Sequence, residues 1–219
     1  MIVIVDYGMG NLRSVQKALQ RVGGEARVSD KAEDVARAER LVVPGVGAFG
    51  DAMAALQERG LVEPIKEFVS GGRPFLGICL GLQMLFEESE EVAEAPVDVA
   101  AMKGRPLPQG LGLLAGRVEK FSRSVVEAGL KVPHMGWNAV EIVQEAPLFD
   151  GMPRQGVYFY FAHSYHAAPA RKADVAAVTD YGGRFTSAVA AGNIMATQFH
   201  PEKSQEAGLR LLENFVTRT

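Results

Sequence analysis

The stretch Gly77-Ile78-Cys79-Leu80-Gly81 places the only cysteine of the chain between two glycines. The apolar residues 75–78 before it predict a buried strand, and residues 80–88 after it predict a helix. Glycines allow the sharp turn that such a junction needs, because they bring no Cβ atom into it. A nucleophile at a turn from strand to helix forms a nucleophile elbow, here with cysteine in place of serine. The alternative is an inert cysteine buried in the core.

The first ninety residues alternate strand and helix patterns, which predicts a mostly parallel central sheet flanked by helices. Strands are expected at 1–6, 25–29, 41–43 and 75–78, and helices at 12–22, 31–39, 51–59, 62–70 and 80–88. The C-terminal half is richer in strand patterns, at 111–120, 137–143, 156–162, 173–179, 185–191 and 194–199. Glycine-containing turns at 182–183 and 192–193 predict hairpins, and residues 204–216 predict a last helix. The expected fold is therefore a single α/β domain with additional antiparallel strands in its C-terminal half.

Composition excludes several classes of protein. The hydrophobic fraction of 47% over 219 residues is enough for one sizeable core, and the net charge of −3 gives no basic field for nucleic acid. A single cysteine cannot form an internal disulfide, which fits a reducing compartment. The apolar N-terminus predicts a first strand and not a signal peptide. No apolar stretch approaches the length of a membrane span. We therefore expect a cytoplasmic protein with no membrane contact.

The loop Pro44-Gly45-Val46-Gly47-Ala48-Phe49-Gly50 directly follows the strand predicted at 41–43. Its glycines leave backbone N–H groups unshielded, so that it can donate hydrogen bonds to an anion or to a developing oxyanion. Ligands of such sheets bind at the carboxyl ends of the strands. This loop and the Cys79 turn both lie at carboxyl ends, and they converge on one site if their strands are neighbours. The alternative is an ordinary connection between a strand and a helix.

Of the four histidines, His200 has the local context of a catalytic base. It ends the apolar run 194–199 and is followed by Pro201 and Glu202. Residues two apart in extended chain point to the same side, so Glu202 can lie beside His200. A carboxylate on one ring nitrogen fixes the tautomer and leaves the other nitrogen to take a proton. The alternatives are a solvated His-x-Glu pair and a metal site. No metal-binding spacing accompanies Cys79, and we expect no metal and no cofactor.

Several motifs together resemble those of the class I, or triad-type, glutamine amidotransferases. Two of these motifs are specific to the superfamily as a whole. They are Gly77-Ile78-Cys79-Leu80-Gly81-Leu82-Gln83 and Phe199-His200-Pro201-Glu202-Lys203-Ser204. Four more resemble the glutaminase subunits of imidazole glycerol phosphate synthase, an enzyme of histidine biosynthesis. These are Asp6-Tyr7-Gly8-Met9-Gly10-Asn11-Leu12, Pro44-Gly45-Val46-Gly47-Ala48-Phe49, Pro133-His134-Met135-Gly136-Trp137-Asn138 and Phe161-Ala162-His163-Ser164-Tyr165. The resemblance runs nearly end to end, so residues 1–219 are expected to form one class I amidotransferase domain of flavodoxin-like fold.

The resemblance implies a role for each matching residue. Cys79 would attack the side-chain amide of L-glutamine, His200 would carry the proton, and Glu202 would orient His200. A thioester would form and be hydrolysed to glutamate, with ammonia kept. The implied oxyanion residues are Val46, Gly47 and Leu80, and the implied substrate-binding residues are Gly45, Gln83, His163, Ser164 and Tyr165.

A partner is implied as well. It is the (β/α)8-barrel cyclase subunit of imidazole glycerol phosphate synthase, in a heterodimer that passes ammonia from one subunit to the other. By resemblance Asn11, Trp137, Tyr160 and Lys203 would lie on or beside the interface. The sequence departs from the family at residues 90–109, which carry extra residues and predict a surface insert.

Other functions are compatible with the same residues. A stand-alone hydrolase such as a γ-glutamyl hydrolase would use the same triad without a partner. A glutaminase could serve anthranilate, GMP or pyridoxal phosphate synthesis, although the motifs before Leu12 and after Pro133 weigh against this. A flavodoxin-like binding module with Cys79 as a redox sensor would not be an enzyme. Ammonia release from glutamine, with and without a cyclase, separates these alternatives.

Overall fold

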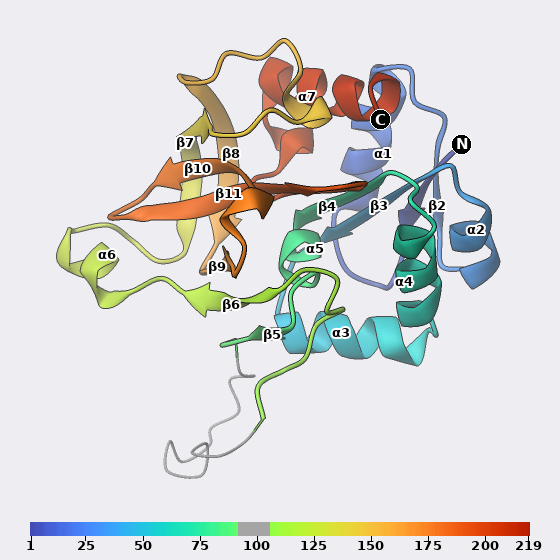
Figure 1. Ribbon diagram of the computed structural model, residues 1–219, viewed down its shortest axis with the longest axis horizontal. Helices are drawn as coiled ribbons and strands as arrows, with labels where there is room; N and C mark the ends of the chain where they lie inside the picture. Colours follow the sequence, from blue (N-terminus) through green and yellow to red (C-terminus); the bar gives the residue numbers. More distant parts are fainter. Residues whose placement is uncertain (92–105) are drawn as a thin grey trace.

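The computed structural model describes residues 1–91 and 106–219 (Figure 1). Its first half alternates strands and helices in the predicted order. The elements are β1 (Ile2–Val5), α1 (Leu12–Arg21), β2 (Ala26–Ser29), α2 (Ala32–Arg37), β3 (Arg40–Gly45), α3 (Phe49–Glu58), α4 (Val62–Ser70), β4 (Phe75–Cys79) and α5 (Leu80–Gln83). Apart from α5, the predicted elements of this half are confirmed to within two residues at each end.

The second half contains most of the antiparallel strands. Its elements are β5 (Glu88–Ser89), β6 (Gly116–Lys120), α6 (Arg123–Glu127), β7 (His134–Ile142), η2 (Pro147–Phe149), β8 (Val157–His163), β9 (Tyr165–Pro169), η3 (Lys172–Asp174), β10 (Val175–Asp180), β11 (Arg184–Ala191), β12 (Ile194–Thr197), η4 (Pro201–Lys203) and α7 (Gln205–Thr217). The predicted hairpins are confirmed, because β11 pairs antiparallel with both β10 and β12. Strand β9 and helix α6 were not predicted.

Two predicted elements are shorter than expected by about half of their length. The helix predicted at 80–88 ends at Gln83, and the backbone carbonyls of residues 84–87 instead accept hydrogen bonds from residues 110–114. The N–H of Leu111 donates to Met84 O at 2.7 Å, and that of Leu113 donates to Leu85 O at 2.9 Å. These bonds also explain why the strand predicted at 111–120 begins only at Gly116. Of the insert predicted at 90–109, residues 92–105 lie outside the described part of the chain.

One mixed sheet organises the described residues. Its main path runs β2-β1-β3-β4-β12-β11-β10-β7-β8. The pairs from β2 to β12 are parallel, and those from β12 to β8 are antiparallel. Figure 1 shows the parallel part on the right of the view and the antiparallel part on the left. The predicted fold class is confirmed, with the parallel strands of the main path at one end of the sheet and a short parallel pair, β5 with β6, on a side branch.

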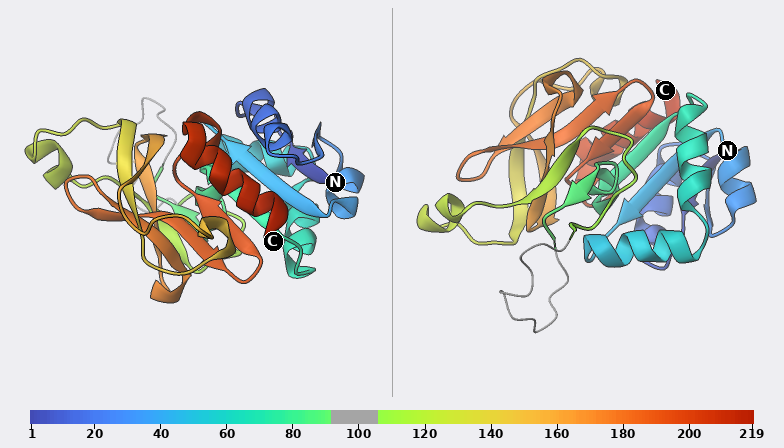
Figure 2. Two further views of the ribbon diagram at one scale, coloured as in Figure 1. Left: turned by 90° about the horizontal axis from the view of Figure 1, so that it is seen from above. Right: turned by 60° about the horizontal axis from the view of Figure 1, so that its bottom comes forward.

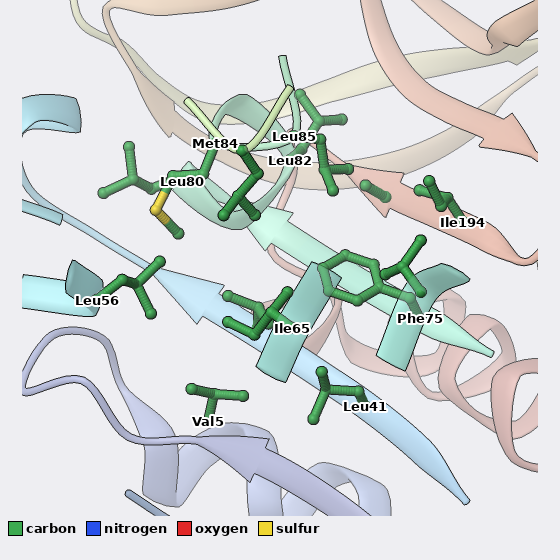
Figure 3. Close-up of a cluster of buried hydrophobic side chains, with 14 of the residues drawn as sticks. Val5, Leu41, Leu56, Ile65, Phe75, Leu80, Leu82, Met84, Leu85 and Ile194 are labelled. Carbon is green, nitrogen blue, oxygen red and sulfur yellow. The ribbon is translucent and has the colours of Figure 1, made fainter. Parts of the chain in front are cut away.

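Alternate residues of the parallel strands belong to two different hydrophobic cores, because successive side chains of a strand point to opposite faces of the sheet. On β1, Val3 and Val5 pack with α3 and α4, whereas Ile2 and Ile4 pack with α1 and α7. Figure 3 shows the first of these cores, with side chains from β3, β4, α3 and α4 in contact. In Figure 2 the helices α1 and α7 lie together on the opposite face from α4. The parallel part of the sheet is thus buried on both faces, as is usual for parallel sheets.

Within the described residues no helix combines the length and the apolar character that a membrane crossing requires.

The elbow glycine Gly81 should tolerate no side chain. A Cβ atom there would lie 1.8 Å from the carbonyl oxygen of Val43, which belongs to the neighbouring strand and cannot move aside. We expect Gly81→Ala to lower the free energy of unfolding by at least about 2 kcal/mol, as overpacking a core does. Urea denaturation measures this.

Gly50 is the matched control, since a Cβ atom there would meet nothing within 4 Å and the residue lies in α3. Gly50→Ala should be neutral or should stabilise by up to about 1 kcal/mol, because alanine favours the helix. Equal stabilities of the two variants would contradict the close packing at Gly81.

Candidate active site

Cys79 lies at the junction of β4 and α5, in a backbone conformation that side chains rarely adopt. Its φ is 56° and its ψ is −106°. Such strain persists only where the surroundings hold it, and here the turn is closed tightly. A Cβ atom on Gly77 would lie 2.6 Å from the carbonyl oxygen of Gly81. The predicted elbow is therefore present, and it holds a thiol that is only 5% exposed at the carboxyl end of its strand.

The glycine-rich loop lies next to the elbow because β3 and β4 are parallel neighbours. In their register Gly45 is opposite Cys79. A cavity of about 250 Å³ opens between the two turns. It is lined by Val46, Gly47, Cys79, Leu80, Gln83, Glu91, Pro133, Ala162, His163, Ser164 and Tyr165. The structure thus brings together every residue predicted for oxyanion and substrate binding except Gly45, which lies buried at the end of β3.

His200 and Glu202 form a buried pair beside the thiol. Nδ1 of His200 lies 2.9 Å from Oε1 of Glu202, and both side chains are nearly inaccessible to solvent. Burial lowers the pKa of His200, but the nearby Cys79 and Glu202 outweigh it and raise the pKa to about 10. Nε2 of His200 is buried and forms no hydrogen bond within the described residues. The raised pKa favours the protonated form of His200, with one ring nitrogen fixed by Glu202 and the other available at the thiol.

The other histidines are in a different environment. His163 lines the cavity, but both of its ring nitrogens are occupied, Nδ1 at 2.8 Å from Tyr165 O and Nε2 at 3.2 Å from His134 Nδ1. Burial lowers the pKa of His134 to about 4 and that of His163 to about 3. Burial also lowers the pKa of His166. These rings are neutral at pH 7, so His200 is the histidine whose charge can balance a thiolate.

Two residues of the site were missed by the sequence reasoning. Glu91 lines the cavity, and its Oε2 accepts a hydrogen bond from Phe49 N at 2.8 Å. Burial raises the pKa of its carboxyl group. Gln198 is fully buried, and its Nε2 lies 3.6 Å from Cys79 Sγ. It precedes His200 by two residues, so the same-side rule that selected Glu202 would also have indicated Gln198. Nothing in the acidic run 87–91 distinguishes Glu91.

Three of the four residues predicted for a partner interface form one surface cluster. Trp137 on β7 is opposite Tyr160 on β8, with ring centroids 6.2 Å apart, and Lys203 Nζ lies 5.7 Å from the Tyr160 ring. Trp137 is 47% exposed. Met135 and Tyr158 are also exposed on these strands. Asn11 caps α1, where its Oδ1 accepts from Ser14 N, and α1 packs against η4, which contains Lys203.

In the part of the chain that the structure describes, no three His, Cys, Asp or Glu side chains come close enough together to hold a metal ion.

Comparisons with known proteins point to one family. The family described as "Glutamine amidotransferase class-I" matches residues 3–219. The chain is 54% identical over 217 residues to "Imidazole glycerol phosphate synthase subunit HisH" of Syntrophotalea carbinolica, covering 98% of both chains. It is 53% identical over 217 residues to the protein of the same name of Rhodopirellula baltica, covering 99% of this chain and 97% of that protein.

Solved structures show the same fold at low sequence identity. "Structure of PurLQS from Thermotoga maritima" contains a chain that is 19% identical, with a TM-score of 0.73 and coverage of 99% of this chain and 97% of that chain. A structure titled "Crystal structure of glutamine amidotransferase" is 23% identical, with a TM-score of 0.70 and coverage of 98% and 99%.

The buried neutral histidines should make the fold sensitive to acid. Their pKa values in the folded state, about 4 for His134 and about 3 for His163, lie below the ordinary value of 6.5. Stability is therefore full above pH 6.5 and is lost as the pH falls toward 4, because only the unfolded state then takes up the protons. Each ring contributes up to about 1.4 kcal/mol per pH unit.

We expect the free energy of unfolding of His134→Phe to fall less steeply with pH than that of the wild type over this window. Urea denaturation at a series of pH values gives both slopes. His200 does not mask the effect, because it is charged in both states below pH 6.5. Equal slopes for the two proteins would mean that His134 is not neutral in the fold.

Proposed function

Because the chain belongs to the class I glutamine amidotransferases, and within them to the HisH subunits of imidazole glycerol phosphate synthase, we propose that Cys79, His200 and Glu202 hydrolyse glutamine through a thioester. Membership makes the chain the glutaminase subunit of that synthase, in histidine biosynthesis. One observation supports the residue assignment above the others. The buried His200–Glu202 hydrogen bond of 2.9 Å lies beside a thiol in a nucleophile elbow.

The proposed reaction begins with the Cys79 thiolate and the His200 cation. The sulfur attacks the side-chain carbonyl carbon of glutamine, and the carbonyl π electrons move onto oxygen. As the tetrahedral intermediate collapses, the C–N bond breaks and the nitrogen takes the proton from His200 Nε2, so that ammonia leaves and a thioester remains. Water then attacks the thioester while His200 takes its proton. The C–S bond breaks, and glutamate is released from the regenerated thiolate.

The oxyanion of each tetrahedral intermediate needs donors that are already in place. Leu80 begins α5, so its N–H has no acceptor within the helix. The loop on the neighbouring strand supplies the second donor, for which we propose the N–H of Val46. Both residues line the same cavity as Cys79, which supports this pairing.

The cavity also has groups that suit the amino-acid end of glutamine. The carboxylate of Glu91 can pair with the α-ammonium group, and the backbone of residues 163–165 can hold the rest of the substrate. Gln83 is limited as a ligand, because its Nε2 donates to Tyr165 O at 2.9 Å and to Gln198 Oε1 at 3.1 Å. We propose that only its Oε1 faces the substrate.

The ammonia is proposed to pass to a (β/α)8-barrel cyclase bound on the outer face of β7 and β8. Met135, Trp137 and Tyr158 on this face are 65%, 47% and 56% exposed. Contiguous apolar side chains at a surface mark an interaction site more often than a free face. The exposed face therefore favours a partnered glutaminase over a stand-alone hydrolase. We further propose that residues 1–219 form one domain and that 90–109 are a surface insert.

Cys79→Ala tests the nucleophile. We expect it to abolish ammonia release from glutamine, because the chain has no second thiol. The complex with the cyclase should still make product from ammonium salts, which shows that the variant folds and binds. His200→Ala should be nearly inactive and Glu202→Gln less impaired, since losing the proton carrier costs more than losing its orienter. Retained glutaminase turnover in Cys79→Ala would overturn the assignment.

Val46→Pro tests the oxyanion donor and the role of the partner. We expect the isolated chain to hydrolyse glutamine slowly and the cyclase with its bound ligand to accelerate it strongly. The peptide between Gly45 and Val46 can turn at small steric cost, because glycine precedes it. Partner binding would then need to favour the inward orientation by only a few kcal/mol.

Proline at position 46 removes the N–H, and one lost oxyanion donor costs roughly a hundred- to a thousandfold in rate. The variant should therefore show little acceleration while still forming the complex, as titration calorimetry can check. If the chain alone turns over as fast as the complex, the stand-alone hydrolase is the correct function.

A further inference from the structure

A run of hydrogen bonds that the proposed mechanism does not use begins at the nucleophile. Gln198 follows β12 and is fully buried, with its Nε2 3.6 Å from Cys79 Sγ. We propose that Gln198 is a further catalytic residue, which donates an N–H hydrogen bond to the Cys79 thiolate. The proposal rests on the role given to Cys79 above. A hydrogen bond to a charged acceptor is roughly twice as strong as one between neutral groups, so this donor favours the thiolate.

The orientation of the Gln198 amide follows from a backbone carbonyl. Nε2 of Gln83 lies 2.9 Å from Tyr165 O, and a carbonyl oxygen can only accept. The same NH₂ group donates its second hydrogen to Gln198 Oε1 at 3.1 Å. With its oxygen turned to Gln83, Gln198 must turn its own NH₂ group to the sulfur. The donor is thus set in place before any substrate arrives.

The Tyr165 carbonyl also accepts a hydrogen bond from His163, which is in turn hydrogen-bonded to His134. His163 Nδ1 lies 2.8 Å from this oxygen, so Nδ1 carries the hydrogen and Nε2 of the neutral ring is an acceptor. His134 Nδ1 donates to that Nε2 at 3.2 Å. Asn138 Nδ2 in turn donates to His134 Nε2 at 3.3 Å and to Asp180 O at 2.9 Å. We call this series of hydrogen bonds, from Asn138 through His134 and His163 to Tyr165, the histidine arm. Each donor and acceptor along the histidine arm has one possible direction.

The arm is complete only while both rings are neutral. A second proton on either His134 or His163 would point one N–H group at another. Burial lowers the pKa values of both rings to about 4 and 3, which keeps them neutral at pH 7. The Asn138 amide is oriented independently, because its Oδ1 accepts from Ala139 N at 2.8 Å. His134 and His163 are thus positioning residues for Tyr165 and, through Gln83, for Gln198.

Gln198→Met tests the donor, because methionine has a similar length and no N–H. Alkylation of the sole thiol by iodoacetamide at pH 7, followed by mass spectrometry, should be roughly ten- to a hundredfold slower than in the wild type. The kcat for glutamine in the cyclase complex should fall by a similar factor, with KM little changed. Gln57→Met on the exposed face of α3 is the matched control and should alkylate at the wild-type rate.

A folded Gln198→Met that alkylates at the wild-type rate would overturn the proposal. Alkylation needs no glutamine turnover, so this outcome is distinct from a failure of the proposed function. If the variant does not fold, the wild type still provides a test. Blocking Cys79 with methyl methanethiosulfonate removes the thiolate, and it should shift the side-chain amide resonances of Gln198 in a ¹⁵N-labelled sample. Unshifted resonances would contradict the hydrogen bond.

The histidine arm has its own readouts. Nitrogen NMR of the wild type should show His134 and His163 as neutral rings with the hydrogen on Nδ1, and an Nε2–H tautomer at either ring would exclude the arm. His134→Phe should raise KM for glutamine, because the wall at Tyr165 loses its support. His166→Phe is the matched control, since His166 lies in the same aromatic cluster but outside the arm. Equal KM values for the two variants would reduce His134 to a packing role.

Discussion

The parallel pairing of β3 with β4 is the contact on which the site depends. It places Gly45 opposite Cys79, so that the loop after one strand and the elbow after the other open into the same cavity. The pairing is close because a glycine at position 81 lets the elbow lie against the Val43 carbonyl. A shift of this register by one residue would turn the side chains of β4 to the opposite face and separate the loop from the thiol.

The pKa values of the buried histidines of the site are shifted in opposite directions. Burial disfavours the charged form of all of them, but His200 has a buried carboxylate on Nδ1 and a thiol nearby, and these outweigh it. His134 and His163 have only neutral partners, so burial prevails. One site therefore contains a charged ring that can move a proton and neutral rings that can hold a backbone carbonyl. The division follows from which partner each ring meets, and not from the residue type.

The antiparallel half of the sheet contributes side chains both to the wall of the cavity and to the exposed surface. Successive residues of β7 and β8 alternate between the two faces, so His134 and His163 point inward while Trp137 and Tyr160 point outward. The inward side chains support the wall of the cavity. The outward ones form the exposed aromatic surface proposed for the cyclase. The same two strands therefore connect a partner surface to the residues that hold Tyr165.

The sequence by itself determined the alternation of the first half, the elbow at Cys79 and the His200–Glu202 pair, because each depends on neighbours within a few residues. It did not determine the end of α5, because the segment that follows Gln83 is hydrogen-bonded to residues 110–114, which are distant in the chain. Nor did it indicate Glu91 or β9, whose partners are distant in the chain. The direction of the Gln198 amide needed contacts from β9 and α5 together. Local patterns specify turns and periodicity, whereas hydrogen-bond partners across the sheet exist only once the chain has folded.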